Sequence, residues 1–350
     1  MPLLTTTIGA YPKPDYAPVP GWFAIRDRHR RNPTEAYSAF LKNVPTDAQA
    51  SLDRATREVV REQAAIGIDV PTDGEIRRGH YIYYHLRHLR GFDFDHLSEN
   101  VMRGGAWQAK VPTVVGPLAA GAEFLVQDWR IAQAVTDQRI KITVPGPLTI
   151  MDSTADEHYR DDRALAFALA DALNVEIRRL AEAGCSWIQV DEPVFARKPD
   201  RALDYGVEAL GRCFAGVTAP VNRVVHICCG YPSELDQEDY PKADQQSYFA
   251  LADAIEAAPV DAVSLEDAHR HNDLKLLERF HSTKVILGVI GIAQTRIEPI
   301  EEIRARLAQA LEHIDAERLI AGPDCGLIML ERTMAMAKLA NLVAAAQSLD

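Results

Sequence analysis

The sequence predicts an α/β protein built as a (β/α)8 TIM barrel, with an N-terminal extension and a β-hairpin excursion. Short runs rich in β-branched and apolar residues alternate with helical patterns along most of the chain. Eight such runs in 350 residues favour a closed barrel over an open, doubly wound sheet. Polar side chains follow the ends of six runs, where a barrel builds its active site. No Gly/Ser-rich linker interrupts the chain, so residues 1–350 are expected to form a single barrel domain.

The first part of the chain contains the less regular elements. We expect a strand at residues 4–8, followed by a proline-punctuated extension at 11–45 that covers an outer face. Residues 46–66 have helical periodicity, and the next strand runs into IDVPTDGE at 68–75. The long aromatic and basic segment 76–135 contains VPTVVGPL, which predicts a β-hairpin near the barrel mouth.

The second part alternates regularly between strands and helices. Strands are expected at residues 142–144, 187–191, 223–228, 262–266, 285–292 and 319–321. Helices are expected at residues 161–183, 201–214, 244–257, 272–280, 299–313 and 329–346. The clearest helix is 161–183, because its leucines and isoleucine form one stripe and Gly184 supplies a stop.

Composition excludes several classes of partner. The chain has 38 Lys and Arg against 50 Asp and Glu, a net charge of −12, so neither a nucleic acid nor an anionic membrane surface is an expected partner. No run approaches 18 uncharged apolar residues, which excludes a spanning helix. The opening MPLLTTTIGAYPKP lacks the basic and apolar regions of a signal peptide, so we expect a cytoplasmic protein. Five cysteines, an odd number at low density, indicate thiols or metal ligands rather than a disulfide framework.

Four residues at predicted strand ends could form a metal site. His226 and Cys228 are two apart in one strand, so both can face the barrel axis, and Glu266 and Cys325 end later strands. Imidazole, thiolate and carboxylate are the usual ligands of zinc. Ligands spread over about a hundred residues, one of them a carboxylate, are more typical of catalytic than of small structural zinc sites. The alternative interpretation is that Cys228 is a core residue and Glu266 begins a helix.

Two further groups of side chains admit a functional interpretation. His269 and His271 could form a second metal site, although solvent-facing or capping roles are favoured because both lie near a helix start. The aromatic and histidine side chains that follow Glu75, beginning with His80 and Tyr81, could form one wall of a pocket. Equally, they could belong to a surface helix whose aromatic side chains pack on the barrel.

With these residues in view, the chain resembles the catalytic C-terminal barrel of cobalamin-independent methionine synthase over nearly its full length. The matching segments are TTTIG at 5–9, DGE at 73–75, GPLTI at 146–150, QVDEP at 189–193, HIC at 226–228, Glu266 in VSLED, and PDCGL at 323–327. The resemblance implies that His226, Cys228, Glu266 and Cys325 bind zinc. It also implies that Ile8, Gly9, Glu75 and Asp191 hold homocysteine. A thiol bound to zinc loses its proton, which would make it a nucleophile at neutral pH.

The sequence departs from the family on the side of the methyl donor. Ser153 stands where the family has a tryptophan that stacks on folate, Ala293 replaces the catalytic histidine, and Ala10 replaces a serine. The family's second, N-terminal barrel, which helps to bind folate polyglutamate, has no expected counterpart within these 350 residues. No residue is therefore assigned as catalytic. A corrinoid methyl-donor protein or a small electrophile fits these changes better than methyltetrahydrofolate.

The leading hypothesis is thus a zinc-dependent methyltransferase of methionine biosynthesis that methylates a small-molecule thiol, homocysteine, to give methionine. A second hypothesis is a zinc-dependent alkyltransferase that joins another thiol to an epoxide or other electrophile, as in epoxyalkane–coenzyme M transferase. A third is a non-catalytic zinc-binding or methyl-carrier partner protein. A fourth, a decarboxylase like uroporphyrinogen decarboxylase, is disfavoured because its chemistry needs no metal.

Overall fold

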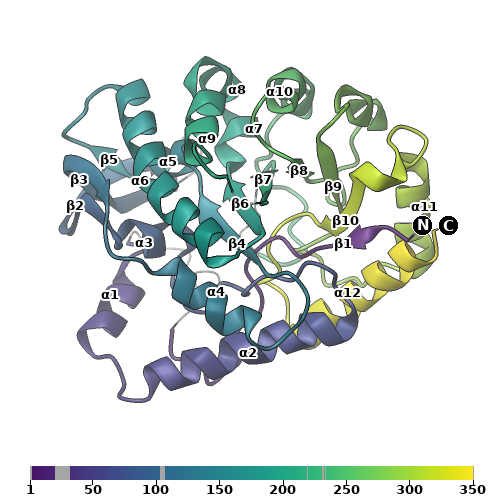
Figure 1. Cartoon of the computed structure of the whole chain (residues 1–350), viewed down its shortest axis with the longest axis horizontal. Helices are drawn as coiled ribbons and strands as arrows, with labels where there is room; N and C mark the ends of the chain where they lie inside the picture. The colour runs from purple at the N-terminus through teal and green to yellow at the C-terminus, as the bar shows by residue number, and fades with distance from the viewer. Residues whose placement is uncertain are drawn as a thin grey trace.

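The central sheet of the computed structural model consists of seven parallel strands. The structure describes residues 2–19, 32–102, 107–218, 220–230, 232 and 234–349. The strands follow one another in the order β1 (Leu4–Thr5), β10 (Leu319–Pro323), β9 (Lys284–Ile290), β8 (Ala262–Leu265), β7 (Asn222–Ile227), β6 (Trp187–Asp191) and β4 (Lys141–Pro145). Figure 1 shows the helices arranged around these strands.

The eighth position of the barrel is an extended segment without a regular ladder. Thr6 forms a parallel bridge with Val70, and Thr72 forms one with Lys141, so residues 70–72 connect β1 to β4 and close the sheet. Pro71 between the bridges has no N–H to donate to a ladder. Its carbonyl instead accepts a hydrogen bond of 2.8 Å from the Lys141 N–H. The predicted TIM-barrel fold is confirmed, with one strand reduced to two bridges.

Helices alternate with the strands along the chain. They are α2 (Ala48–Ile66), α4 (Leu125–Gln133), α5 (Pro147–Asp152), α6 (Asp162–Ala183), α7 (Pro193–Arg197), α8 (Pro199–Arg201), α9 (Val207–Cys213), α10 (Gln246–Glu256), α11 (Ile300–Ala310) and α12 (Arg332–Gln347). A short 3₁₀ turn at Ala316–Arg318 precedes β10. The longest, α6, is capped by the Asp161 side chain, which accepts from Ala164 N–H, and ends at left-handed Gly184 as predicted.

Two predicted helices differ in kind from the expectation. The segment predicted as a helix at 201–214 contains a π-helical stretch, Ala202–Gly206, before α9. A widened turn of this kind shifts the inward-facing positions, which helical periodicity cannot reveal. The segment predicted at 272–280 is a short 3₁₀ helix, Leu274–Arg279, which buries Leu274, Leu276 and Leu277.

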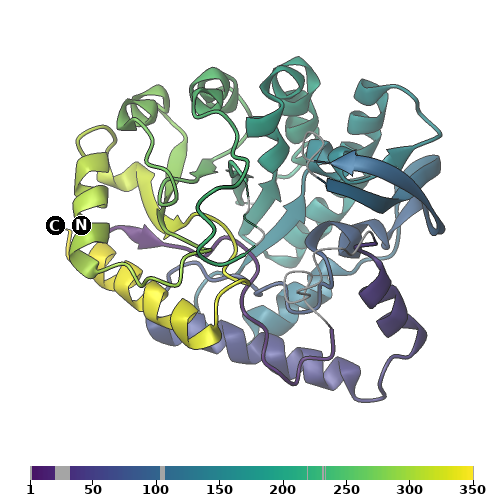
Figure 2. The ribbon, with the colours of Figure 1, turned by 180° about the vertical axis from the view of Figure 1, so that it is seen from behind.

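The predicted excursion is a long antiparallel hairpin. Strand β2 (Leu89–Met102) pairs with β3 (Trp107–Ala120), and β5 (Ala155–Asp156) adds a short parallel strand to it. Figure 2 shows this small sheet standing beside the barrel, next to α3 (Tyr81–Leu86). The N-terminal extension contains α1 (Glu35–Lys42), and its residues 20–31 lie outside the described residues.

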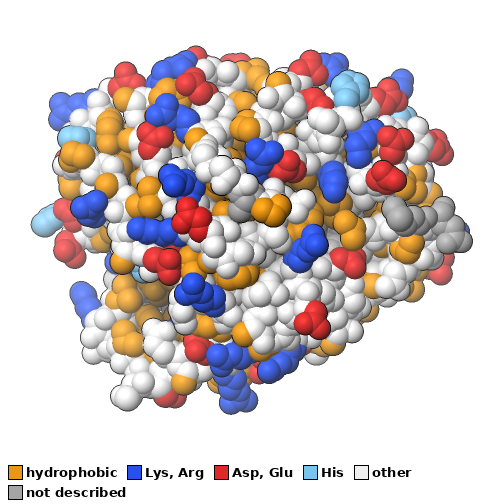
Figure 3. Space-filling model, in the orientation of Figure 1, with side chains coloured by type: hydrophobic (Ala, Val, Ile, Leu, Met, Phe, Trp, Pro, Cys, Tyr) orange, Lys and Arg blue, Asp and Glu red, His pale blue; other side chains and the backbone are white. Residues whose placement is uncertain are grey.

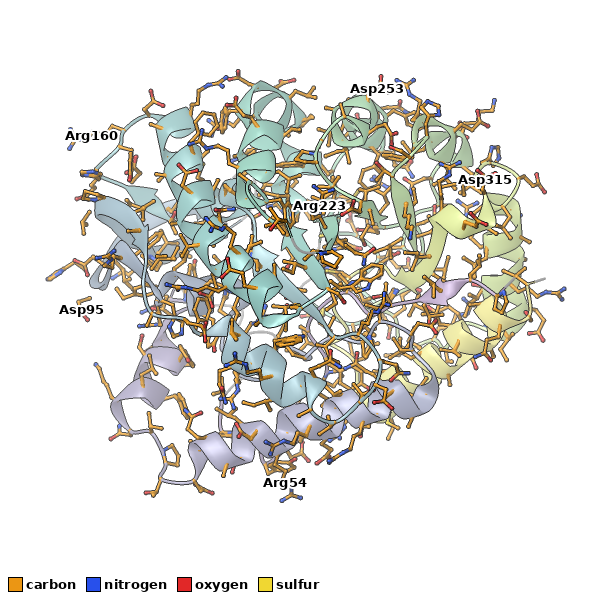
Figure 4. All side chains as sticks on the ribbon, in the orientation of Figure 1. Arg54, Asp95, Arg160, Arg223, Asp253 and Asp315 are labelled. Atoms are coloured by element: carbon orange, nitrogen blue, oxygen red, sulfur yellow. The ribbon has the colours of Figure 1, made fainter. Side chains whose placement is uncertain are left out.

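Apolar side chains fill the barrel and the space between strands and helices, while charged side chains cover the outside. On the face shown in Figure 3, basic and acidic side chains alternate without a large patch of one sign. Figure 4 shows charged side chains such as Arg54, Asp253 and Asp315 at the rim of the molecule. Arg223, at the beginning of β7, clamps that strand to the next by two hydrogen bonds to Asp261, of 2.8 and 2.9 Å. Among the described residues, no helix is long and apolar enough to cross a membrane.

Candidate active site

A pocket opens at the carboxyl ends of the strands. Its interior cavity measures about 110 Å³, and a wide mouth connects it to solvent. Its lining combines apolar side chains with a few polar ones, as is typical of small-molecule sites. Seven of the eight residues singled out in the sequence line it: Ile8, Gly9, Glu75, Asp191, His226, Cys228 and Cys325. They come from the ends of β1, β6, β7 and β10 and from the turn that follows residues 70–72. The exception is Glu266.

His226, Cys228 and Cys325 form a compact cluster in the pocket. One ring nitrogen of His226 and the two Sγ atoms all lie within 4.8 Å of one another. The His226 Nδ1 hydrogen-bonds the Ser264 hydroxyl at 2.9 Å, while its buried Nε2 has no hydrogen-bond partner among the described residues. The pKa of the Cys228 thiol lies well below its ordinary value, mainly because the Cys325 side chain hydrogen-bonds to it. Burial opposes this shift, and His226 adds to it. One imidazole nitrogen and two sulfurs are therefore poised to share a common partner.

Glu266 follows β8 and lies outside this cluster. Its Oε1 forms an ion pair with Lys242, and its Oε2 accepts a hydrogen bond of 3.0 Å from the Cys229 N–H. Burial, together with the nearby Asp324 carboxylate, raises the pKa of Glu266 to about 7, although Lys242 opposes this shift. The structure therefore brings three of the four predicted metal ligands together, whereas the fourth, Glu266, forms an ion pair with Lys242.

Two buried carboxylates occupy the other side of the pocket. Glu75 accepts a hydrogen bond of 2.7 Å from the Thr143 hydroxyl and lies 3.3 Å from the Arg78 guanidinium. Asp191 accepts one of 2.7 Å from the Gln189 amide. Burial raises the pKa of Asp191 to about 7, with the nearby Glu75 adding to the shift and His226 opposing it. Such carboxylates are suited to binding a cationic group of a ligand.

In the second histidine group, His269 is part of the scaffold, whereas the side chain of His271 is 66% exposed. His269 Nδ1 contacts Asp324 at 2.7 Å, and its Nε2 accepts a hydrogen bond of 3.3 Å from the Ala293 N–H. Asp324 also accepts the backbone N–H groups of residues 267–269. The ligand atoms of His269, Asp324 and Glu266 are close enough to hold a metal. However, their hydrogen bonds already use both ring nitrogens and both Asp324 oxygens, as expected for a fixed turn.

The aromatic segment after Glu75 divides between the two interpretations. Arg78, Gly79, His80 and Tyr81 line the pocket. Beyond them the side chains pack inward: the Tyr83 hydroxyl donates to the Ser153 carbonyl, and His88 stacks on Phe124 with ring centroids 4.1 Å apart. The segment thus both borders the pocket and packs on the barrel.

Sequence reasoning missed three cationic residues at the site: Arg78, Arg197 and Lys242. Arg78 and Arg197 line the pocket, and Arg197 also pairs with Asp152 at 3.2 Å. Arg78 could have been found from its position three residues after Glu75, and Arg197 from its place at the end of the helix that follows DEP. Lys242 gives no such signal, because it lies in an irregular loop.

Of the three positions that depart from the family pattern, one lies in the pocket. Ala10 lines it, whereas Ser153 ends α5 and Ala293 is buried beside His269. Neither Ser153 nor Ala293 presents a ring or a titratable side chain.

Comparisons with known proteins agree with these observations. The sequence pattern of the family described as "Cobalamin-independent synthase, Catalytic domain" matches residues 3–348. A methionine synthase of Saccharolobus solfataricus is 31% identical over 348 residues, which cover 98% of this chain and 94% of that protein. A methionine synthase of Sulfolobus acidocaldarius is 30% identical over 344 residues, covering 97% and 90%.

Solved structures give the same picture. A B12-independent methionine synthase from Shewanella sp., in complex with selenomethionine, superposes with a TM-score of 0.85 at 30% identity, covering 99% of this chain and 97% of that one. A putative vitamin-B12-independent methionine synthase from Listeria monocytogenes shares the fold at a TM-score of 0.73 and 20% identity, covering 100% and 98%.

Proposed function

The chain belongs to the cobalamin-independent methionine synthase family, a family of methyltransferases, and on that premise we propose that it methylates the sulfur of homocysteine to give methionine. The observation that carries this proposal is the convergence of His226, Cys228 and Cys325 in one pocket with the acids Glu75 and Asp191. The Shewanella relative was solved with selenomethionine, an analogue of this product.

We infer that the resident cofactor is zinc, held by His226, Cys228 and Cys325 with Glu266 as a fourth ligand. The donor set fits, because two thiols and an imidazole are zinc ligands and the buried Nε2 of His226 has no hydrogen-bond partner among the described residues. The hydrogen bond between Nδ1 and the Ser264 hydroxyl fixes the ring, as is typical for the second nitrogen of a ligating histidine. A bound zinc ion would keep the substrate sulfur in its thiolate form at neutral pH.

The remaining residues of the pocket would bind and orient the amino acid. Asp191 and Glu75 offer buried carboxylates to the substrate ammonium, and backbone around Ile8 and Gly9 lines the same wall. Arg78 and Thr143 hold the Glu75 carboxylate in place. Because the substrate would be held at its ammonium group and at its sulfur, the sulfur would approach the donor in one orientation.

We propose that the methyl donor is a corrinoid protein or a small electrophile rather than methyltetrahydrofolate. Without a tryptophan at position 153, a pterin would lose roughly 0.5–1.5 kcal/mol of stacking. Without a histidine at position 293, no side chain at that position could protonate the leaving group. The loss of such proton donation typically lowers the rate about 10²–10⁴-fold. A methyl-corrinoid loses neither advantage, because cobalt leaves without a proton.

Product analysis tests the proposal. Zinc-loaded protein is incubated with homocysteine and one donor at a time: methyltetrahydrofolate, methylcobalamin or a methylated corrinoid protein. We expect methionine with a corrinoid donor and little with free methyltetrahydrofolate. Methionine formation from methyltetrahydrofolate at an ordinary enzyme rate, about 1–10³ s⁻¹, would refute the donor assignment. In a further arm, an epoxide and another thiol replace these reactants. Product in that arm, with no methionine from any donor, would refute homocysteine as the acceptor.

A further inference from the structure

The Glu266 carboxylate has a partner on each of its oxygens. Oε1 pairs with the Lys242 ammonium, and Oε2 accepts from the Cys229 N–H at 3.0 Å. The two charged side chains are only 13% and 4% exposed, so the pair is largely shielded from water.

The loop between β7 and α10 holds Lys242 in this position. The Ala243 N–H donates to the Cys229 carbonyl at 2.8 Å, which folds the end of the loop back onto its beginning. Gly230 makes this possible, because its φ of 148° is strained for other residues and a Cβ there would lie 2.9 Å from the Pro241 carbonyl oxygen. The Lys242 ammonium also lies 5.1 Å from the centre of the Tyr240 ring. The lysine is therefore positioned by the fold rather than free on the surface.

The backbone of Glu266 is fixed independently of this pair. Its N–H donates to the Tyr248 hydroxyl at 3.2 Å, and its carbonyl accepts from the Asn272 amide at 2.6 Å. A change of partner for the carboxylate would therefore involve the side chain. The Cys229 N–H that Oε2 accepts belongs to the residue directly after Cys228, so the carboxylate already lies beside the segment that carries the proposed metal ligands. The same carboxylate cannot give its full charge to a lysine and to a metal at once.

We propose that Lys242 is a positioning residue that makes Glu266 an exchangeable ligand. By competing for the carboxylate, Lys242 favours the arrangement in which the fourth coordination position goes to the substrate sulfur. This inference rests on the proposed zinc site. It predicts effects of opposite sign: without the lysine, the free protein should bind zinc more tightly, and the zinc-loaded protein should bind homocysteine more weakly.

The variant Lys242→Met tests this directly, since it keeps most of the length of the side chain and removes its charge. Zinc affinity is measured by competition with a fluorescent chelator, and homocysteine affinity by calorimetry on zinc-loaded protein. We expect zinc affinity to rise and homocysteine affinity to fall, each by roughly 5- to 150-fold, the usual range for coupled sites. Lys242→Arg should restore values near those of the wild type, and Lys275→Met, at an exposed lysine on the 3₁₀ helix, should change neither.

A double-mutant cycle shows whether the effect passes through Glu266. In a Glu266→Gln background, Lys242→Met should leave zinc affinity unchanged. Weaker zinc binding by Lys242→Met, or an equal gain in both backgrounds, would overturn the proposal and leave Lys242 as a structural counter-ion. Thermal unfolding of each variant shows whether it is folded. If Lys242→Met is misfolded, Lys242→Arg in both Glu266 backgrounds is compared instead. If the wild type itself binds no zinc, the proposed cofactor fails, an outcome distinct from wild-type zinc binding that Lys242 does not influence.

Discussion

At the scale of single residues, the position of each side chain relative to a strand end decides what it can do. Cys228 and Cys325 meet because both follow strands that end at the same rim, whereas Cys229 points into the core, where burial raises its pKa to about 12. This much could be predicted from alternation along a strand. The partner of Glu266 could not, because Lys242 reaches it through a loop whose path depends on Gly230 and on tertiary contacts.

Substitution of the cysteines distinguishes these roles. Cys325→Ser should lower bound zinc sharply, because a hydroxyl is a poor substitute for a thiolate ligand. Cys229→Ser and Cys185→Ser, both at buried thiols outside the cluster, serve as controls and should retain about one zinc per chain. Zinc content measured by atomic emission after dialysis checks this expectation, and full retention in Cys325→Ser would contradict the proposed ligand set.

The acidity of Asp191 predicts how substrate binding depends on pH. Because burial raises its pKa to about 7, Asp191 is mostly neutral below pH 7 and mostly ionised above it. An ammonium group needs the ionised form, so homocysteine affinity should fall as the pH falls through 7. Asp191→Asn should weaken binding by roughly 2–5 kcal/mol and flatten this profile. Calorimetry between pH 6 and 8, with zinc content checked in each sample, makes the measurement. A profile that is unchanged in Asp191→Asn would assign the dependence to another group.

At the scale of elements, hydrophobic periodicity located the strands and the long helices, and it failed where local geometry is unusual. The predicted strand at 187–191 and helix at 161–183 match β6 and α6 to within a residue. The π-helical stretch Ala202–Gly206 and the 3₁₀ helix Leu274–Arg279 were beyond reach, because both depend on how a short segment packs. The segment at 68–75 reads as a strand, yet Pro71 limits it to two bridges.

The turn between β4 and α5 offers a test at this scale. The Glu192 carboxylate accepts the Leu148 and Thr149 N–H groups, each at 3.0 Å, and so caps the short helix. A Cβ on Gly146 would come within 2.3 Å of that carboxylate. Gly146→Ala should therefore displace Glu192 and cost about 1–3 kcal/mol of stability by leaving buried groups unpaired.

Gly116→Ala is the matched control, since a Cβ there meets nothing within 4 Å. Urea unfolding of both variants gives the comparison. Equal stability of Gly146→Ala and the wild type would show that α5 does not depend on this cap.

At the scale of the whole molecule, the candidate metal site joins strands that are distant in the barrel. Cys325 follows β10 and His226 lies in β7, with β8 and β9 between them in the sheet. The two ends of the chain lie side by side (Figures 1 and 2). The Leu3 N–H donates a hydrogen bond of 3.3 Å to the Ala346 carbonyl and so joins them. The barrel and this convergence could be inferred from the order of motifs, whereas the exact approach of the sulfurs required the folded chain.

Removal of the metal should therefore destabilise the whole barrel. A ligand that binds only the folded state adds about 2.7 kcal/mol at a free concentration 100 times its dissociation constant. Zinc should raise the unfolding temperature of the wild type, and a chelator should reverse the gain. Cys325→Ser, measured alongside, should respond far less. An identical response of the two proteins would place the stabilising zinc elsewhere.

The most direct measurement of the central claim is the number of protons released when homocysteine binds to the zinc-loaded protein. Calorimetry at pH 8 in buffers of different ionisation enthalpy yields this number, and at that pH Asp191 is already largely ionised. If the metal cluster holds the substrate as a thiolate, about one proton should be released per homocysteine bound. Homoserine, which lacks the thiol, should release almost none. Homocysteine binding without proton release, or the same release from the Cys325→Ser variant, would contradict the account.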